Sequence, residues 1–437
     1  MSTLTAQVSE CPVANRKSAV KLNIGLNEHG MVLLGAAVCF FGAVLWVCSG
    51  RACEQSHFAI AYVGARIVHV GEGARLYDLR EQDAIKASSL KAQNPMVYDH
   101  PPFEALLLSP LAGLPYRTAY FVWGLINIVI WLSLPWILRP YAPAPSETLG
   151  YFALWFLFAP LGMTLYLGQV SLVLLLLYAL TYINLKQKRD FQAGLLLGLG
   201  LFKFHLVLPF VVIFLLMRKW RFVEGFSVSA ALLGALSLLV GGWRGILSYG
   251  RFLSVIARSP RSVTTGLAVK MATIQGFANS TLGRRLAPST IGLIVTIASV
   301  FVLLFVAGSW RRLRDDRSEP SFDLMFAAAI VASLVVGFHV LPYDLSLLML
   351  SILMVMKHFP QGERRGLRFV LGTALVLLWI PATYIGLLAA ESVYLMFPLL
   401  LLFGLATLAL AFKTATGDLT PAPKERGAPE DRWAVSA

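Results

Sequence analysis

Residues 31–48 read MVLLGAAVCFFGAVLWVC, an unbroken apolar run that begins thirty residues into the chain. At about 1.5 Å per residue, a helix of this run would span roughly 27 Å, which is close to the thickness of the hydrocarbon core of a bilayer. The run lacks a small-residue cleavage site, so it is predicted to be an uncleaved membrane anchor and not a signal peptide. The interpretation of the rest of the chain follows from this anchor.

The composition extends the membrane assignment to the whole chain. Of 437 residues, 57% are hydrophobic and only 14% are charged. The apolar runs are continuous and do not alternate, which excludes a membrane β-barrel and favours helices. We therefore predict an all-α integral membrane protein, a polytopic helical bundle of about eleven crossings over residues 31–412. Two of the four cysteines, Cys39 and Cys48, lie inside the first run, so no disulfide framework is expected.

The basic residues predict the orientation of the bundle. The net charge is +14, but the basic residues cluster at the ends of apolar runs, so a nucleic-acid partner is not expected. Cytoplasmic loops carry an excess of Lys and Arg. This predicts a multi-pass protein of the cytoplasmic (inner) membrane with both termini in the cytoplasm: an N-terminal segment at residues 1–30 and a disordered tail at 413–437. The basic clusters are 16–17, 186–189, 218–221, 311–317 and 364–368.

Two longer polar interruptions are predicted on the extracytoplasmic side. The first, residues 51–101, is a large loop that would provide a polar shelf for a substrate at the water interface. The second, residues 241–288, carries seven Lys and Arg side chains. Positive charge outside contradicts the positive-inside rule. Either the predicted topology slips by one crossing here, or these residues bind an anionic ligand.

Several polar side chains stand in apolar surroundings. Lys203 and His205 lie in the middle of the run 191–217, which has basic residues at both ends. If both ends are cytoplasmic, this run is a broken hairpin with Lys203 at its tip. A lysine in lipid is costly, so we expect it to face a cavity and a phosphate or carboxylate partner. Weaker candidates, each equally consistent with a turn or helix junction, are Asp99, His100, Gln169, His339 and Asp344. No metal-binding spacing and no phosphate-binding glycine loop is present, so neither a metal nor another cofactor is expected.

Between about Ser56 and Leu350 the chain resembles the glycosyltransferase family 87 membrane proteins. The resemblance rests on short motifs that occur in the order of the family. They are Phe58 with Tyr62 and Ala65, Gly71-x-Gly73, Leu76-Tyr77-Asp78, His100-Pro101-Pro102-Phe103, Pro110-Leu111-Ala112-x-Leu114-Pro115, Leu167-Gly168-Gln169, Ala193-Gly194 with Lys203, and Tyr343-Asp344.

The resemblance implies a membrane hexosyltransferase that uses a polyprenyl-phosphate sugar of mannose type as donor. The acceptor would be a lipid or envelope glycan on the extracytoplasmic face, and membrane lipids would surround the protein. Attack by an acceptor hydroxyl requires a general base. The departing lipid phosphate requires positive charge, which Lys203, His205 and His339 could supply. Tyr77, His100, Gln169, Tyr343 and Asp344 complete the implied substrate site.

One departure from the family affects the catalytic residue. Family members commonly show Asp-Phe where this chain has His57-Phe58. Three interpretations stay open. A nearby carboxylate, Asp78 or Asp99, is the base; His57 is the base; or the transferase activity has been lost. The rival functions are a transporter or flippase for a lipid-linked sugar and a catalytically inactive partner in envelope assembly.

Overall fold

The computed structural model describes residues 39, 41–43, 56–90, 97–143, 148–258, 270–313, 316–360, 365–389 and 395–416. Secondary structure in these ranges is entirely helical, as the sequence predicted. Of the predicted anchor at 31–48, only residues 39 and 41–43 are described, and they are helical. The predicted N-terminal segment 1–30 and nearly all of the tail 413–437 lie outside the described residues. The last helix does reach Ala415, so the start of that tail is helical.

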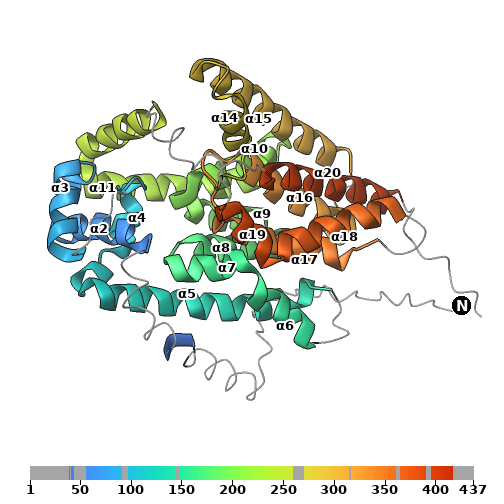
Figure 1. Cartoon of the computed structure of the whole chain (residues 1–437), viewed down its shortest axis with the longest axis horizontal. Coiled ribbons are helices and arrows are strands. Elements are labelled where there is room, and N and C mark those ends of the chain that lie inside the picture. Colours follow the sequence, from blue (N-terminus) through green and yellow to red (C-terminus); the bar gives the residue numbers. More distant parts are fainter. Residues whose placement is uncertain are drawn as a thin grey trace, which may run out of the picture.

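The described part of residues 51–101, the predicted first extracytoplasmic loop, is a packed helical unit, and its place outside the membrane stays a prediction. Figure 1 shows α2, α3 and α4 together at one end of the molecule, next to α11. The segment is polar in composition because its apolar side chains, such as Phe58 and Ile67, lie only on the buried faces of its helices. The elements are α2 (Phe58–His69), the 3₁₀ turn η1 (Gly73–Arg75), α3 (Leu79–Ile85), the π turn η2 (Lys86–Leu90), α4 (Pro102–Leu108) and η3 (Leu111–Gly113).

The next four helices run back and forth beside this unit. The long helix α5 (Tyr116–Leu138) begins after Pro115, where a proline is compatible with a helix start, and continues into η4 (Arg139–Tyr141). Its return is made of two pieces, α6 (Thr148–Leu157) and α7 (Ala159–Leu167), since Phe158 between them has an extended backbone. Gly168 then ends α7 in the left-handed conformation, and α8 (Ser171–Lys186) turns back.

The predicted break at Lys203 is present. The chain passes through α9 (Asp190–Gly198), the 3₁₀ turn η5 (Leu199–Lys203) and α10 (Phe204–Leu216). A straight helix of these 27 residues would be about 40 Å long. Both of its ends instead lie at the same end of the bundle, so the chain reverses at η5. Three side chains connect Asp190 of α9 to Phe214 of α10. Asp190 pairs with Arg317, Arg317 lies 4.9 Å from the centre of the Phe322 ring, and the Trp310 ring contacts both Phe322 and Phe214.

The longest helix, α11 (Trp220–Arg258), lies parallel to α9 at an unusually close distance. A Cβ atom on Gly194 would come within 1.9 Å of the Phe222 carbonyl oxygen, and one on Gly225 within 1.9 Å of the Phe191 carbonyl oxygen. Glycine is therefore needed at both contacts, as is usual where membrane helices approach closely. The helix changes direction at Gly242, which has φ of 60°. The predicted polar segment 241–288 is thus also largely helical where it is described.

The helix α16 is buried on all sides, with α10, α14, α15, α17 and α20 packed against it. Fifteen consecutive residues of α16, Ser321–Val335, are buried, as expected for a helix that is apolar all round. Figure 1 shows α20 beside α16 in the C-terminal half. The elements are α14 (Ile274–Leu282), α15 (Pro288–Arg311), α16 (Pro320–Val336), η6 (Asp344–Leu347), α17 (Leu348–Lys357), α18 (Arg365–Trp379), α19 (Pro381–Ala389) and α20 (Met396–Ala415).

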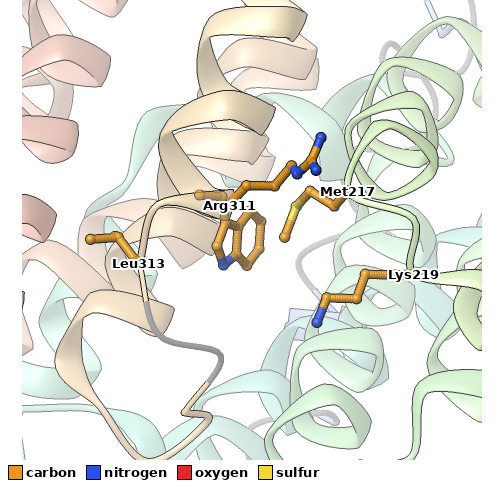
Figure 2. A pocket seen from close by; sticks show the side chains of 5 residues that line it. Met217, Lys219, Arg311 and Leu313 are labelled. Carbon is orange, nitrogen blue, oxygen red and sulfur yellow. The ribbon is translucent and has the colours of Figure 1, made fainter.

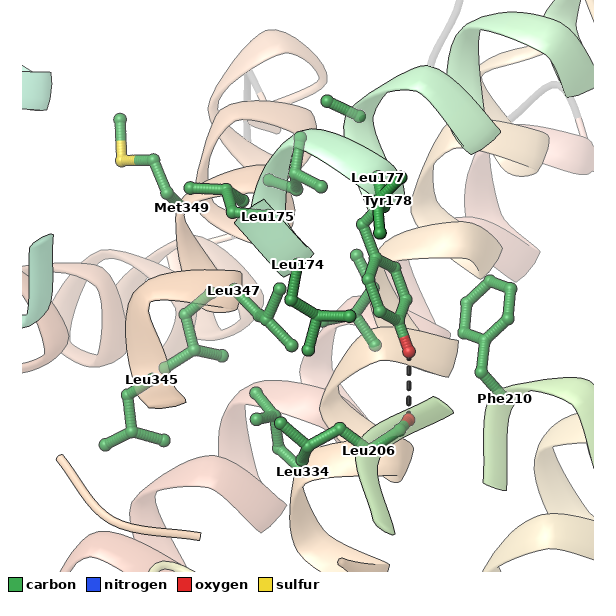
Figure 3. Close-up of a cluster of buried hydrophobic side chains, with 14 of the residues drawn as sticks. Leu174, Leu175, Leu177, Tyr178, Leu206, Phe210, Leu334, Leu345, Leu347 and Met349 are labelled. Carbon is green, nitrogen blue, oxygen red and sulfur yellow. Dashed lines mark hydrogen bonds between the residues drawn. The ribbon is translucent and has the colours of Figure 1, made fainter. Parts of the chain in front are cut away.

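The core connects α8, α10 and α17 through leucines and aromatic rings. Figure 3 shows the Tyr178 hydroxyl of α8 donating a hydrogen bond of 2.9 Å to the Leu206 carbonyl of α10. This bond satisfies a buried hydroxyl and holds the start of α10 against α8. Five helical segments among the described residues are long and apolar enough to cross a membrane, and several others are shorter. A polytopic membrane bundle is consistent with these helices, whereas the predicted eleven crossings are not established.

Candidate functional site

Lys203 lies at the reversal between α9 and α10, with φ of −115° and ψ of 58°. It is 4% exposed, and its ammonium group donates to three partners. These are the Asp344 carboxylate, the Ser171 hydroxyl at 2.8 Å and the Gln169 side-chain oxygen at 3.4 Å. An ammonium group has three protons, so its hydrogen-bonding capacity is fully used. The partner expected from the sequence is therefore the Asp344 carboxylate.

Asp344 begins η6 and is 1% exposed. Besides Lys203, it accepts hydrogen bonds from the Ser171 hydroxyl at 3.1 Å and the Leu341 backbone amide at 3.1 Å. The Lys203 ammonium group also lies over the ring face of the neighbouring Tyr343, with 4.9 Å between its nitrogen and the ring centre, in a cation–π contact. Asp344 and Lys203 neutralise each other, and a buried pair is tolerated when such additional bonds satisfy both groups.

Gln169 connects this ion pair to His57. It follows Gly168, whose left-handed backbone (φ 64°) turns the chain from α7 into α8. The side-chain nitrogen of Gln169 lies 2.7 Å from Nδ1 of His57. Lysine can only donate, so the oxygen of the Gln169 amide faces Lys203 and its NH₂ group donates to Nδ1 of His57. The neutral His57 ring consequently carries its proton on Nε2.

His57 precedes α2 and is held by its backbone and its ring. Its amide donates to the Leu167 carbonyl at 2.9 Å, and its ring meets Tyr343 edge to face at 5.3 Å. Burial and the positive charge of Lys203 lower its pKa to about 4. His57 is therefore neutral at physiological pH. We call the group His57, Gln169, Ser171, Lys203, Tyr343 and Asp344 the Lys203 cluster.

A second group, the His100 triad, consists of Asp99, His100 and Glu104 at the start of α4. Nδ1 of His100 lies 2.5 Å from the Glu104 carboxylate, and Nε2 lies 3.6 Å from Asp99. Burial opposes a charge on His100, but Glu104 and Asp99 outweigh it and raise its pKa to about 9. The imidazole is thus protonated at neutral pH, and the charge of His100 also contributes to the lowered pKa of His57. The two groups are within electrostatic range of each other.

The remaining predicted histidines lie close to the Lys203 cluster. Both His205 and His339 interact electrostatically with Lys203 and Asp344. The Nε2 atom of His205 is buried, with no hydrogen-bond partner among the described residues. His339 also interacts electrostatically with Asp99, which ties the two groups together.

Asp78 and Tyr77 have structural contacts in the α2–α4 unit. The Asp78 carboxylate caps α3 by accepting from the Arg80 amide at 2.9 Å, and it lies 3.9 Å from the Arg75 guanidinium. The Tyr77 hydroxyl donates to the His100 carbonyl at 2.8 Å, and its ring stacks on Tyr249. Tyr77 thereby holds the backbone of the His100 triad. The contacts of Asp78 involve neither the Lys203 cluster nor the His100 triad.

Two residues of the site were not predicted from the sequence. Ser171 bridges the Lys203–Asp344 pair. The buried Glu104 stabilises the protonated form of His100, and its second carboxylate oxygen has no hydrogen-bond partner among the described residues. Glu104 follows His100 by four residues across a helix start, a spacing that brings side chains together and could have identified it. Within the described ranges, no group of three His, Cys, Asp or Glu side chains is arranged to hold a metal ion.

Comparison with known proteins gives one match. The family model described as glycosyltransferase family 87 matches residues 98–337, more than half of the chain. The matched region contains the His100 triad together with Gln169, Ser171, Lys203 and His205. It does not extend to His57 or to Asp344. No curated protein and no solved structure matches.

Proposed function

The chain belongs to glycosyltransferase family 87, a family of membrane glycosyltransferases, and we propose that it transfers a hexose from a polyprenyl-phosphate carrier. In this proposal the sugar is of mannose type and the acceptor is a lipid or envelope glycan. Transfer takes place on the extracytoplasmic face of the cytoplasmic membrane, within a transferase unit of residues 31–412. Both termini of the chain lie in the cytoplasm.

The observation that carries the proposal is the electrostatic coupling between the Lys203 cluster and the His100 triad. Residues from five separate segments of the chain converge there, and they differ in charge and protonation in the ways that glycosyl transfer requires. One group must accept a proton from the acceptor hydroxyl, and others must stabilise negative charge on the departing phosphate.

We assign the general base to Asp99. His57 accepts a bond from Gln169 on Nδ1 and carries its proton on Nε2, so it has no free lone pair for an acceptor proton. His100 is already protonated, and Asp78 caps a helix. The side chain of Asp99 is 45% exposed, lies 3.6 Å from His100 and interacts electrostatically with His339, so it can reach a substrate hydroxyl.

The phosphate would be stabilised by groups that donate. His57 offers an Nε2–H group, and His100 offers positive charge near neutral pH. Lys203 is neutralised by Asp344, so we assign it to holding Gln169 and thereby the tautomer of His57. His205, whose Nε2 has no protein partner among the described residues, is a further contact for a substrate oxygen.

Transfer assays on membranes test the base assignment. Asp99→Asn should lower the transfer rate from labelled polyprenyl-phosphate mannose by about 10²–10⁴-fold, the usual contribution of a general base. Asp78→Asn is the matched control, since asparagine also caps helices, and it should transfer normally. Normal transfer by Asp99→Asn with loss in His57→Gln would assign the base to His57 instead.

The same assay separates the rival functions. Wild-type protein that never transfers the sugar, but moves the labelled donor between the two leaflets of a vesicle, would be a transporter. Protein that does neither would be a non-catalytic assembly partner. Either result contradicts the proposed activity whatever the behaviour of the variants.

A further inference from the structure

A second polar feature lies at the opposite end of α10 from the Lys203 cluster. Three apolar segments end together there: α10 stops at Leu216, α11 starts at Trp220 and α15 stops at Arg311. They enclose a pocket of about 230 Å³ lined by Met217, Lys219, Trp310, Arg311 and Leu313. Figure 2 shows Met217 and Lys219 on the turn before α11, with Arg311 coming from α15. The thirteen residues of α10 separate this pocket from Lys203 by about 20 Å.

The lining combines an apolar base with two cations. Trp310 is 3% exposed and packs against Phe214 and Phe322, so the aromatic side of the pocket is firmly held. The Arg311 side chain is exposed, and no carboxylate pairs with it in the part of the chain that the structure describes. An exposed guanidinium beside apolar side chains suits an anionic group with an attached hydrocarbon.

Several buried or half-buried cations at this end of the bundle are held in ion pairs of the protein. We call Lys186, Asp323, Lys357 and His358 the Asp323 cluster, in which one buried carboxylate contacts two lysines and a histidine at 2.7–3.3 Å. Arg317 pairs with Asp190 at 3.0 Å. These contacts join α8, α9, α16 and α17 and account for those charges structurally. Within the described ranges, no ion pair of this kind includes Arg311.

We propose that this pocket binds the phosphate of an anionic phospholipid. Arg311 and Lys219 contact the phosphate, while Met217, Trp310 and Leu313 contact the glycerol and the first acyl carbons. The level of the pocket favours a lipid over a free ion, because three apolar segments end there and thus mark the border between hydrocarbon and headgroups. A tryptophan at this level is typical of the membrane interface.

Lipid retention by the full-length protein tests the proposal. Protein is reconstituted in nanodiscs that contain phosphatidylglycerol and phosphatidylcholine, released into detergent, and examined by native mass spectrometry for bound lipid. The wild type should retain phosphatidylglycerol selectively. The double variant Lys219→Gln/Arg311→Gln should bind it about 25-fold more weakly, at about fivefold for each charge removed. Lys219→Arg/Arg311→Lys keeps both charges and should retain the lipid, which excludes a mere folding defect.

The charge-matched control removes two exposed cations elsewhere, in Arg365→Gln/Arg368→Gln of α18. Its affinity for phosphatidylglycerol should stay within about threefold of the wild type. Loss of even one direct contact with the headgroup would lower the affinity by more, about fivefold. Equal retention by the pocket variant and the wild type would overturn the proposal. So would an equal loss in the control, which would indicate only a general surface potential. Complete displacement of the lipid by inorganic phosphate would assign the pocket to the free ion instead.

Discussion

The buried pair Lys203–Asp344 gives the strongest test of the described site through the variant Lys203→Met. Methionine has nearly the length of lysine but no charge and no protons to donate. The side chains of Lys203 and Asp344 are 5% and 2% exposed. The change therefore leaves a carboxylate buried without its cation, while Ser171 and the Leu341 amide remain as its donors.

The expected cost follows from this burial. Removing one partner of a buried pair destabilises a protein by about 3–5 kcal/mol, and Asp344→Asn should cost a similar amount because it strands the lysine. Additive effects would therefore sum to about 6–10 kcal/mol in the double variant. Lys203→Met/Asp344→Asn strands no charge, since asparagine still accepts from the Leu341 amide. It should cost only about 1–2 kcal/mol for the hydrogen bonds that are lost.

The assay is the free energy of unfolding in mixed detergent–SDS micelles for the wild type, both single variants and the double variant. Lys186→Met is the matched control, because Asp323 keeps Lys357, His358 and Tyr182 when this lysine is removed. It should cost no more than about 1 kcal/mol. The loss in Lys203→Met should also shrink at acidic pH, where the stranded carboxyl group can take up a proton. A double variant as unstable as the sum of the two singles would refute the pairing.

Three further predictions use the same unfolding measurement. Gly168→Ala should cost about 1–3 kcal/mol, because φ is 64° and the new Cβ would lie 2.9 Å from Cβ of Phe58; an effect as small as that of Gly162→Ala, where nothing lies within 4 Å, would contradict this. The pKa of His100 is raised from 6.5 to about 9, so the stability it contributes is complete below pH 6.5 and is lost as the pH rises through 9; His100→Gln should abolish that decline, and an unchanged profile would exclude it. Asp323→Asn should cost about 3–5 kcal/mol by removing the shared carboxylate from two lysines and a histidine; a loss below about 1 kcal/mol would show that those cations are solvated.

The sequence predicted the apolar helices well because their signal is local. The long helices α5 and α15 each coincide with a continuous apolar run of the sequence. The helices within 51–101 and 241–288, which were predicted only as polar extracytoplasmic segments, were missed in the described parts for a related reason. Helices such as α2 bury one face against neighbours, so their polar side chains on the other face lower the average apolarity of the segment.

The site was predicted where one residue stood out against its surroundings. Lys203 was found because a lone cation in an apolar run requires a partner, and Asp344 was among the candidates although 141 residues separate the two. Ser171 was missed because nothing local distinguishes a serine at a helix start from a bridging hydroxyl. Asp78 was a candidate because a helix cap and a catalytic carboxylate look alike until the position of the helix is known.

The resemblance to the family implied an aspartate at position 57, and the groups around His57 suggest what the exchange for histidine would change. An aspartate at position 57 would face the Gln169 amide and lie near Lys203. Both of its carboxylate oxygens could accept hydrogen bonds. Histidine accepts on Nδ1 from the same amide, but it must then present a proton on its other nitrogen. The side chain therefore changes from a proton acceptor to a donor at an almost unchanged position.

A catalytic base is then needed from another segment. Asp99 fits this need because it is partly exposed and its neighbour His100 is already protonated. Restoring the acid with His57→Asp should consequently make Asp99 dispensable, and transfer that still depends fully on Asp99 in the His57→Asp background would refute the exchange of roles.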